Sequence, residues 1–306
     1  AQQALDLIGR LLINPGDVVL TEEPTFLGAL QAFTACEAQY VTVPIDDDGM
    51  RVDRLEEALR SGAKFLYVLP NFQNPTGTTL SLERRQRLIE LASRYGTPVV
   101  EDDPYGQLRY EGEHLPPLVQ IDAEHHGCAQ GERSFRGGVL YLGTFSKILA
   151  PGLRLGFVVA PEEVIARLVQ LKQGADLHTS TFTQMVVHEA ARDGFLDRHV
   201  PVIRKVYRER RDTMLAAMDR HFPQSVRWTR PQGGLFLWAT LPQGIDSAKV
   251  LEEALRNKVA FVPGAAFFPR GGGAETLRLN FSYCTPDRIE EGIRRLGEVL
   301  ASSVRA

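Results

Sequence analysis

The residues best suited to chemistry follow three apolar runs of the chain. FLYVLP (65–70) precedes NFQNPTG, TPVV (97–100) precedes EDDPY, and VLYLG (139–143) precedes TFSK. Together the three segments that follow contain an amide, two or three carboxylates, a phenol, two hydroxyls and a lysine. Because this set combines charges with hydrogen-bonding groups, it suits a charged, heterocyclic and phosphorylated ligand.

Lys147 is the lysine best placed to act as a nucleophile. Of the six lysines, it alone directly follows a strand-like run, with Ser146 before it and Arg154 seven residues later. A lysine amine forms a Schiff base when burial and nearby cations lower its pKa. An arginine and neighbouring hydroxyls can bind a phosphate dianion. The pattern therefore favours a Schiff-base lysine beside a phosphate site, against the simpler interpretation of a surface lysine.

The elements that must position these residues alternate between strand and helix. Strand-like runs lie at 17–24, 38–45, 65–70, 97–105, 138–147 and 155–160, and helical patterns lie at 4–12, 26–36, 51–62 and 81–96. This alternation predicts an α/β fold with a mostly parallel sheet covered by helices on both faces. In such sheets ligands bind beyond the carboxyl ends of the strands, where the three polar segments begin.

The later part of the chain has a different pattern. Residues 162–222 are largely helical, 226–242 resemble a hairpin, and 277–284 alternate like a strand. We therefore expect a large domain over residues 1–200 and a smaller α+β domain over 201–306. The polar segment 122–138 is predicted to be a long surface loop.

Composition excludes several classes of partner. The 306 residues are 43% hydrophobic and 24% charged, with a net charge of −3, which gives no electrostatic case for nucleic acid or a membrane surface. No apolar stretch is long enough to span a bilayer. The three cysteines, Cys36, Cys128 and Cys284, form no CxxC pair, which favours a reducing cytoplasm. The sequence contains no metal-binding motif, so we expect no metal site.

Four segments in this order give the chain a family resemblance. NFQNPTG, VVEDDPY, GTFSKILAPGLRLGF and LRLNFS resemble those of class I/II aminotransferases, which depend on pyridoxal 5′-phosphate (PLP) and have fold type I. The resemblance covers essentially the whole chain and is greatest to the 2-aminoadipate, kynurenine and aromatic aminotransferases. It implies PLP as cofactor, amino acids and 2-oxo acids as substrates, and a homodimer.

The resemblance also implies roles for the residues at the strand ends. Lys147 would form the Schiff base with PLP and move the substrate proton. Asp102 would pair with the pyridinium nitrogen and keep it protonated, so that the ring can accept electrons. Asn74 and Tyr105 would hydrogen-bond the cofactor's phenolate oxygen, and Asn74 would also lie at the substrate.

The remaining implied roles concern the phosphate, the ring face and the substrate. Thr144, Ser146 and Arg154 would bind the phosphate. Phe26 would stack on the ring, and Arg278 would bind the substrate α-carboxylate with its two-pronged guanidinium.

Each of these residues also has a structural interpretation. Asp102 and Asp103 could form a solvated turn, and Asn74 stands in a sequence that favours turns anyway. Phe26 could belong to the core, and Arg278 could face solvent from an alternating strand.

The beginning of the chain departs from the family pattern. Relatives carry a further N-terminal segment that ends in a Gly-Ser-Gln-type turn at the phosphate. Gln2 matches that glutamine, whereas Ala1 stands where a serine is expected. We therefore expect a fragment, or a chain whose beginning was not included.

Three functions follow from this reading. The first is an aminotransferase with ping-pong kinetics, in which an amino acid gives its amino group to PLP and a 2-oxo acid such as 2-oxoglutarate then accepts it. The second is the aminotransferase-like effector domain of a MocR-type transcription regulator. The third is a lyase or racemase of the same fold type.

Overall fold

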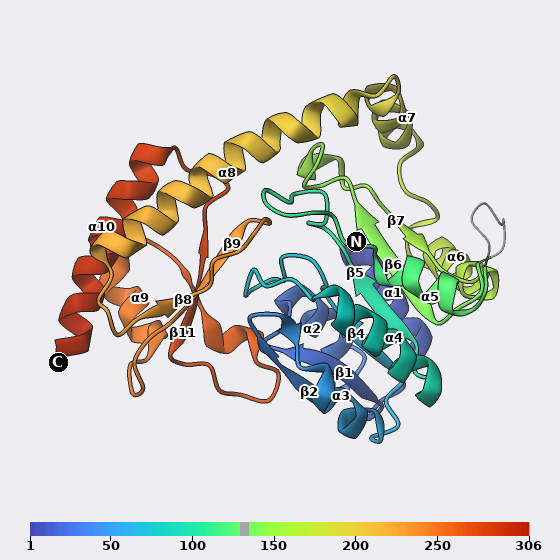
Figure 1. The fold of residues 1–306 in the computed structure, drawn as a ribbon. Coiled ribbons are helices and arrows are strands. Elements are labelled where there is room, and N and C mark those ends of the chain that lie inside the picture. The colour runs from blue at the N-terminus through green and yellow to red at the C-terminus, as the bar shows by residue number, and fades with distance from the viewer. Residues whose placement is uncertain (129–134, 306) are drawn as a thin grey trace.

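The computed structural model describes residues 1–128 and 135–305. Its largest feature is a seven-stranded sheet (Figure 1). In spatial order the strands are β3 (Gly49–Met50), β2 (Gln39–Asp46), β1 (Val18–Glu23), β4 (Phe65–Val68), β5 (Val99–Asp102), β6 (Val139–Thr144) and β7 (Gly156–Val159). The five inner strands are parallel, and the edge strands β3 and β7 are antiparallel to their neighbours. The predicted mostly parallel sheet is therefore confirmed.

Both faces of this sheet are buried, because alternate residues of a strand point to opposite sides. Phe65 and Val100 pack in one hydrophobic core with helices of one face, while Leu66 and Val99 pack in a second core with helices of the other. The first core receives α1 (Gln2–Leu12), α2 (Leu27–Thr34) and α6 (Glu162–Asp176), and the second α3 (Val52–Leu59), α4 (Leu82–Tyr95) and α5 (Leu118–His125). This burial on both faces explains why the segments predicted as strands are continuous apolar runs.

Helix α4 begins and ends where its sequence predicts. The Ser81 side chain accepts a hydrogen bond from the backbone nitrogen of Arg84 at the N-terminus. Gly96 adopts a left-handed conformation with φ of 62° at the C-terminus, where a residue with a side chain would be strained. These two residues fix the start and the end of the helix that follows the NFQNPTG segment.

A second, smaller sheet lies apart from the first, on the left in Figure 1. Its strands in spatial order are β10 (Val262–Pro263), β11 (Thr276–Asn280), β9 (Phe236–Thr240) and β8 (Arg227–Trp228). The helices that accompany this sheet are α8 (Phe195–His221), α9 (Ser247–Arg256), α10 (Pro286–Arg305) and the short 3₁₀ helix η2 (Gly264–Phe267). Helix α7 (Thr181–Ala191) and the 3₁₀ helix η1 (Pro151–Leu153) precede α8 in the chain. The long helix α8 extends from α7, near the large sheet, to α10. The antiparallel β8–β9 pair confirms the predicted hairpin.

The prediction of a loop over 122–138 is wrong for its first four residues, which complete α5. Asp122 is buried and accepts hydrogen bonds from the backbone nitrogens of Gly138 (2.8 Å) and Val139 (3.0 Å). The polar composition concealed this contact, which joins the end of α5 to the start of β6. Residues 129–134 lie outside the described part of the chain. Within that part, no helix is both long and apolar enough to cross a membrane.

Candidate active site

The ends of three adjacent parallel strands form the centre of the site. β4 leads into the loop that carries Asn74, β5 ends at Asp102 with Tyr105 shortly after it, and β6 ends at Thr144 just before Lys147. Because these strands are neighbours and run in the same direction, their polar segments emerge at one edge of the sheet.

Asp102 is buried, and only one of its two side-chain oxygens has a hydrogen-bond partner among the described residues. Its Oδ2 accepts a hydrogen bond of 2.8 Å from the Tyr67 hydroxyl. Within the residues that the structure describes, the buried Oδ1 has no hydrogen-bond partner. Burial raises the pKa of Asp102 to about 6, although the Tyr67 hydrogen bond opposes this change. A buried oxygen without a donor is costly, and a protonated ring nitrogen would supply one. The residue therefore fits the pyridinium of PLP.

Asn74 links the large sheet to the small one. Its Nδ2 donates to the Tyr105 hydroxyl at 3.4 Å, and its Oδ1 accepts a hydrogen bond of 2.7 Å from Arg278 on β11. Asn74 and Tyr105 are both buried. The structure thus brings together an amide, a phenol and a guanidinium from three separate parts of the chain.

Two aromatic rings flank Arg278. Its guanidinium carbon lies 4.3 Å from the ring centroid of Phe236 and 5.1 Å from that of Phe267. Across the described part of the chain, no group accepts a hydrogen bond from its buried Nε. An Arg278 held between rings, with an unpaired N–H, is suited to a planar anion such as a carboxylate.

Lys147 is half-buried beside two cations. Burial lowers the pKa of its amine, and the charges of Arg154 and Arg278 lower this pKa further. A lowered pKa increases the neutral, nucleophilic fraction of the amine at neutral pH. The electrostatic surroundings therefore suit the predicted Schiff-base lysine.

The predicted phosphate-binding residues gather near the N-terminus of α1. Ser146, Arg154 and Gln2 line one cavity of about 630 Å³. Thr144 lies beside them, since its hydroxyl donates to the Ser146 hydroxyl at 3.0 Å and accepts from the Ser146 backbone nitrogen at 3.1 Å. Hydroxyls, an exposed arginine and a helix N-terminus form a combination that suits a phosphate group.

Phe26 and Gln2 meet at Gly28. Gln2 donates to the Gly28 carbonyl at 2.7 Å. A Cβ atom on Gly28 would lie 2.6 Å from both the Phe26 ring and the Gln2 side chain, so a larger residue would displace these two side chains. Phe26 is half-buried against the core and precedes the first turn of α2.

Sequence reasoning missed several residues of the site. Tyr67 was read only as part of an apolar run, although its hydroxyl is the one side-chain polar group in FLYV. Phe236 and Phe267 were assigned no role, because the contacts of Arg278 join segments distant in the chain. The resemblance implies no role for Asp103, which follows Asp102 in the chain.

Glu22 is a further buried carboxyl close to the Asn74 loop. Its Oε2 accepts hydrogen bonds from the Leu69 backbone nitrogen (3.1 Å) and Gln73 Nε2 (3.3 Å). Burial raises the pKa of Glu22 from 4.5 to about 8, against the effect of these hydrogen bonds. The stability gained from the bound proton is therefore fully present below pH 4.5 and is lost as the pH rises towards 8.

Replacing Glu22 with glutamine is expected to flatten this dependence. As the pH rises, the free energy of unfolding of the wild type should fall more steeply than that of Glu22→Gln. The two slopes should differ by up to about 1.4 kcal/mol per pH unit. Urea denaturation at several pH values between 4.5 and 8 measures the difference. The exposed Glu57→Gln serves as control. Equal slopes for wild type and Glu22→Gln would contradict the prediction.

The chain is similar to several known proteins. A family model described as aminotransferase class I and II matches residues 1–296. Aromatic-amino-acid aminotransferase 1 of Thermococcus litoralis is 48% identical, covering 100% of this chain and 72% of the relative. 2-Aminoadipate transaminase of Thermus thermophilus is 46% identical, covering 98% and 73%. The crystal structure of kynurenine aminotransferase from Pyrococcus horikoshii, in complex with PMP, is 48% identical with a TM-score of 0.93, covering 100% and 74%.

Proposed function

Because the chain belongs to the class I and II aminotransferases and is a PLP-dependent transaminase of amino acids, we propose that the site described above holds its cofactor and substrate. The observation that carries this proposal is the buried Asp102 Oδ1, which has no partner in the described residues. The fold is that of PLP fold type I, as the resemblance implied.

The cofactor would be held by groups from several elements. Asp102 would hold a proton on the ring nitrogen, Asn74 and Tyr105 would hydrogen-bond the phenolate oxygen, and Phe26 would cover the ring. The phosphate would be bound by Gln2, Thr144, Ser146 and Arg154. When bound, PLP supplies an electron sink for the electron pair left as the substrate Cα–H bond breaks.

The substrate would be bound and deprotonated by two further residues. Arg278 would bind the α-carboxylate through its unpaired Nε, while Asn74 and the rings of Phe236 and Phe267 hold the guanidinium in place. The Lys147 amine, whose pKa is lowered, would take the proton from the substrate Cα and return it to the product.

We propose that the amino donor is an aromatic amino acid, 2-aminoadipate or kynurenine, as the names of the relatives suggest, and that 2-oxoglutarate is the acceptor. The full-length protein should form glutamate from 2-oxoglutarate with at least one donor of a panel that contains these compounds. Without an oxo acid, the reaction should stop after one amino group per site. Continued turnover without an oxo acid would indicate a lyase or racemase instead.

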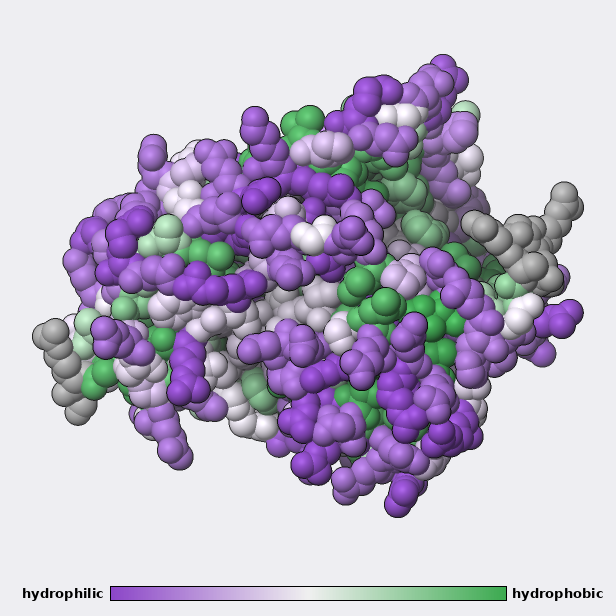
Figure 2. All heavy atoms as spheres, viewed as in Figure 1, coloured by the Kyte–Doolittle hydropathy of each residue, from purple (hydrophilic) through white to green (hydrophobic). Residues whose placement is uncertain are grey.

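A homodimer is also part of the proposal. Large apolar side chains are exposed on α6, α7 and α8 and directly after α6, among them Val169 (48% exposed), Leu177 (72%), Phe182 (77%), Met185 (66%) and Val202 (60%). Figure 2 shows apolar residues gathered on the visible face near α7 and β7. Exposed patches of this kind support a protein interface. Sedimentation of the full-length protein as a monomer at micromolar concentration would refute the proposal.

We also propose the domains 1–200 and 201–306, and a cytoplasmic location. The boundary falls inside α8, and the second domain holds the smaller sheet. A fragment 201–306 that fails to fold would count against this division. The three cysteines are free, as a reducing compartment allows, and recovery of the protein outside the cytoplasm in cell fractionation would refute the location.

A further inference from the structure

Arg85 of α4 is a fully buried arginine (0% exposed) behind the active site. Its Nε donates to the Leu80 carbonyl at 2.9 Å, and its Nη1 donates to the Pro116 carbonyl at 2.9 Å. Its Nη2 donates both to the Pro70 carbonyl at 2.8 Å and to Asn71 Oδ1 at 2.6 Å. Burying a charged group is unfavourable unless hydrogen bonds compensate for the lost water, so four acceptors around one guanidinium indicate a specific role.

The two ends of the Asn74 loop meet at Arg85. The Leu80 backbone nitrogen donates to the Pro70 carbonyl at 2.9 Å, which closes the base of loop 70–80. Arg85 donates to the carbonyls of both residues. The guanidinium therefore holds together the base of the loop from which Asn74 reaches the site.

A second set of hydrogen bonds extends from Arg85 to the loop after β5. Asn71 accepts from Arg85 and donates through Nδ2 to Asp103 Oδ1 at 3.0 Å. The same Oδ1 accepts from the Gly106 backbone nitrogen at 2.8 Å, and Oδ2 accepts from the Tyr141 hydroxyl at 3.2 Å. Asp103 thus connects the Asn74 loop to the turn that carries Tyr105.

Arginine is the side chain that suits this position. Its planar guanidinium presents five N–H donors in a fixed geometry, whereas lysine has three donors on one atom. Burial lowers the pKa of Arg85 to about 10, so the side chain stays charged at neutral pH. The carboxylates of Glu101 and Asp103 lie near enough to favour that charge.

We propose that Arg85, acting through Asn71 and Asp103, is a positioning residue that fixes Asn74 relative to Asp102 and Tyr105. This inference rests on the roles proposed above for those three residues. Arg85 touches neither substrate nor cofactor; it holds the two loops that do.

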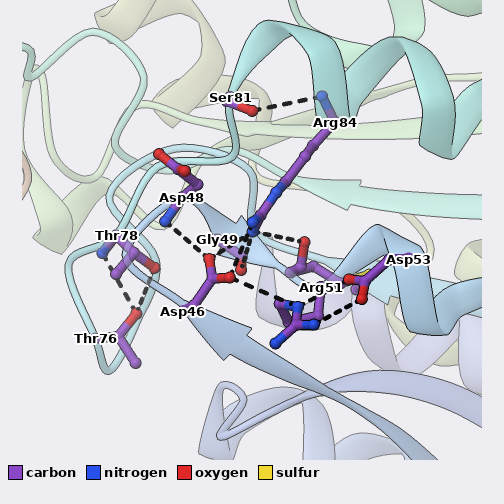
Figure 3. Close-up of polar contacts among 10 residues, drawn as sticks. Asp46, Asp48, Gly49, Arg51, Asp53, Thr76, Thr78, Ser81 and Arg84 are labelled. Carbon is purple, nitrogen blue, oxygen red and sulfur yellow. Dashed lines mark hydrogen bonds and ion pairs between the residues drawn. The ribbon is translucent and has the colours of Figure 1, made fainter.

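Arg84 provides a matched control, because it precedes Arg85 in the same turn of α4. Figure 3 shows its side chain reaching the turn between β2 and β3, where it contacts Asp46 and the Gly49 carbonyl. Its Nη2 lies 2.8 Å from Asp46 Oδ2. Replacing Arg84 removes an arginine of the same helix and leaves the hydrogen bonds of Arg85 in place.

The test compares Arg85→Met, Arg85→Lys, Asn71→Asp and Arg84→Met in the full-length protein. Asn71→Asp keeps the acceptor for Arg85 but places an oxygen where Nδ2 donates to Asp103. Each apoprotein is titrated with PLP, and the pH midpoint of the visible band of the bound cofactor is then measured. Donors to the phenolate oxygen stabilise its negative charge, so a misplaced Asn74 raises this midpoint.

We expect PLP affinity to fall about tenfold in Arg85→Met and Asn71→Asp, and the midpoint to rise in both, since small misplacements of binding groups have large effects. Arg85→Lys should recover part of the loss, and Arg84→Met should stay within about twofold of wild type. Folded Arg85→Met with a wild-type midpoint would overturn the proposal, even if its thermal stability is reduced. If Arg85→Met does not fold, wild-type midpoints in both Arg85→Lys and Asn71→Asp would overturn it. A wild type without any visible band would instead contradict the proposed function.

Discussion

Replacing Lys147 with alanine is expected to lower kcat by about 10⁴-fold and to remove the visible band that a Schiff base with Lys147 would give bound PLP. The substitution removes the amine to which the cofactor is proposed to attach, which is also the proposed base for the substrate proton. Proton transfer by a positioned side chain contributes up to about 10⁴-fold to a rate, so kcat should fall by about 10⁴-fold. The lowered pKa of Lys147, caused by burial and then by Arg154 and Arg278, suits the amine to both proposed tasks.

The control for this substitution is Lys205→Ala. Lys205 is exposed on α8, so its loss should leave kcat and the spectrum unchanged. Borohydride treatment gives an independent readout: PLP should remain covalently attached to the peptide that contains Lys147 in the wild type and in Lys205→Ala. A wild-type visible band in Lys147→Ala, or attachment at another lysine, would show that the assignment is wrong.

The sheet and the strand-end residues were predictable because burial shapes sequence strongly there. FLYV is hydrophobic, apart from the Tyr67 hydroxyl, since both faces of β4 are covered. The polar residues after β4, β5 and β6 stand out because apolar runs precede them. Ser81 and Gly96 mark the ends of α4 through local backbone chemistry, which needs no knowledge of the fold.

The contacts that complete the site were not predictable from residue pattern alone. Arg278 and Asn74 are 204 positions apart, and only the docking of the small sheet on the large one brings them together. An arginine in an alternating strand reads equally well as solvent-facing, so its role came from the family resemblance. The aromatic rings around it depend on the same docking.

Buried polar networks also could not be predicted from the composition of the sequence. Arg85 occurs in the charged run SLERRQR, where Arg84 and Arg85 look equivalent. The helical period places Arg85 towards the core and leaves Arg84 partly exposed. Asp122 was assigned to a loop for a similar reason, although it is buried at the end of α5.

Replacing Asp102 with asparagine is expected to lower kcat by about 10³-fold, because the site loses the negative charge that we propose keeps the ring nitrogen protonated. The change preserves the size of the side chain and an oxygen acceptor for the Tyr67 hydroxyl. PLP affinity should also fall, as the cation on the ring loses its partner. Fluorescence titration of the apoprotein measures this affinity separately from turnover.

Glu101→Gln is the matched control, because it replaces the adjacent buried carboxyl group of the same strand. Successive side chains of a strand point to opposite faces. Accordingly Glu101 accepts hydrogen bonds from Leu118 (2.8 Å) and Val119 (2.9 Å) at the start of α5, whereas Asp102 contacts Tyr67. Activity of Glu101→Gln should stay within about threefold of wild type, because the Glu101 side chain points to the sheet face opposite Asp102.

A cofactor analogue separates the charge of Asp102 from its other contributions. PLP methylated at the ring nitrogen carries a permanent positive charge and does not need a carboxylate to hold a proton there. Asp102→Ala leaves room for the added methyl group, so this variant should regain much of the lost kcat with the analogue, whereas wild type should gain nothing. If the analogue does not bind to Asp102→Ala, the PLP affinity of Asp102→Asn, compared with that of wild type, tests the same role of Asp102. If Asp102→Asn kept the PLP affinity and kcat of wild type, Asp102 Oδ1 would not face the ring nitrogen.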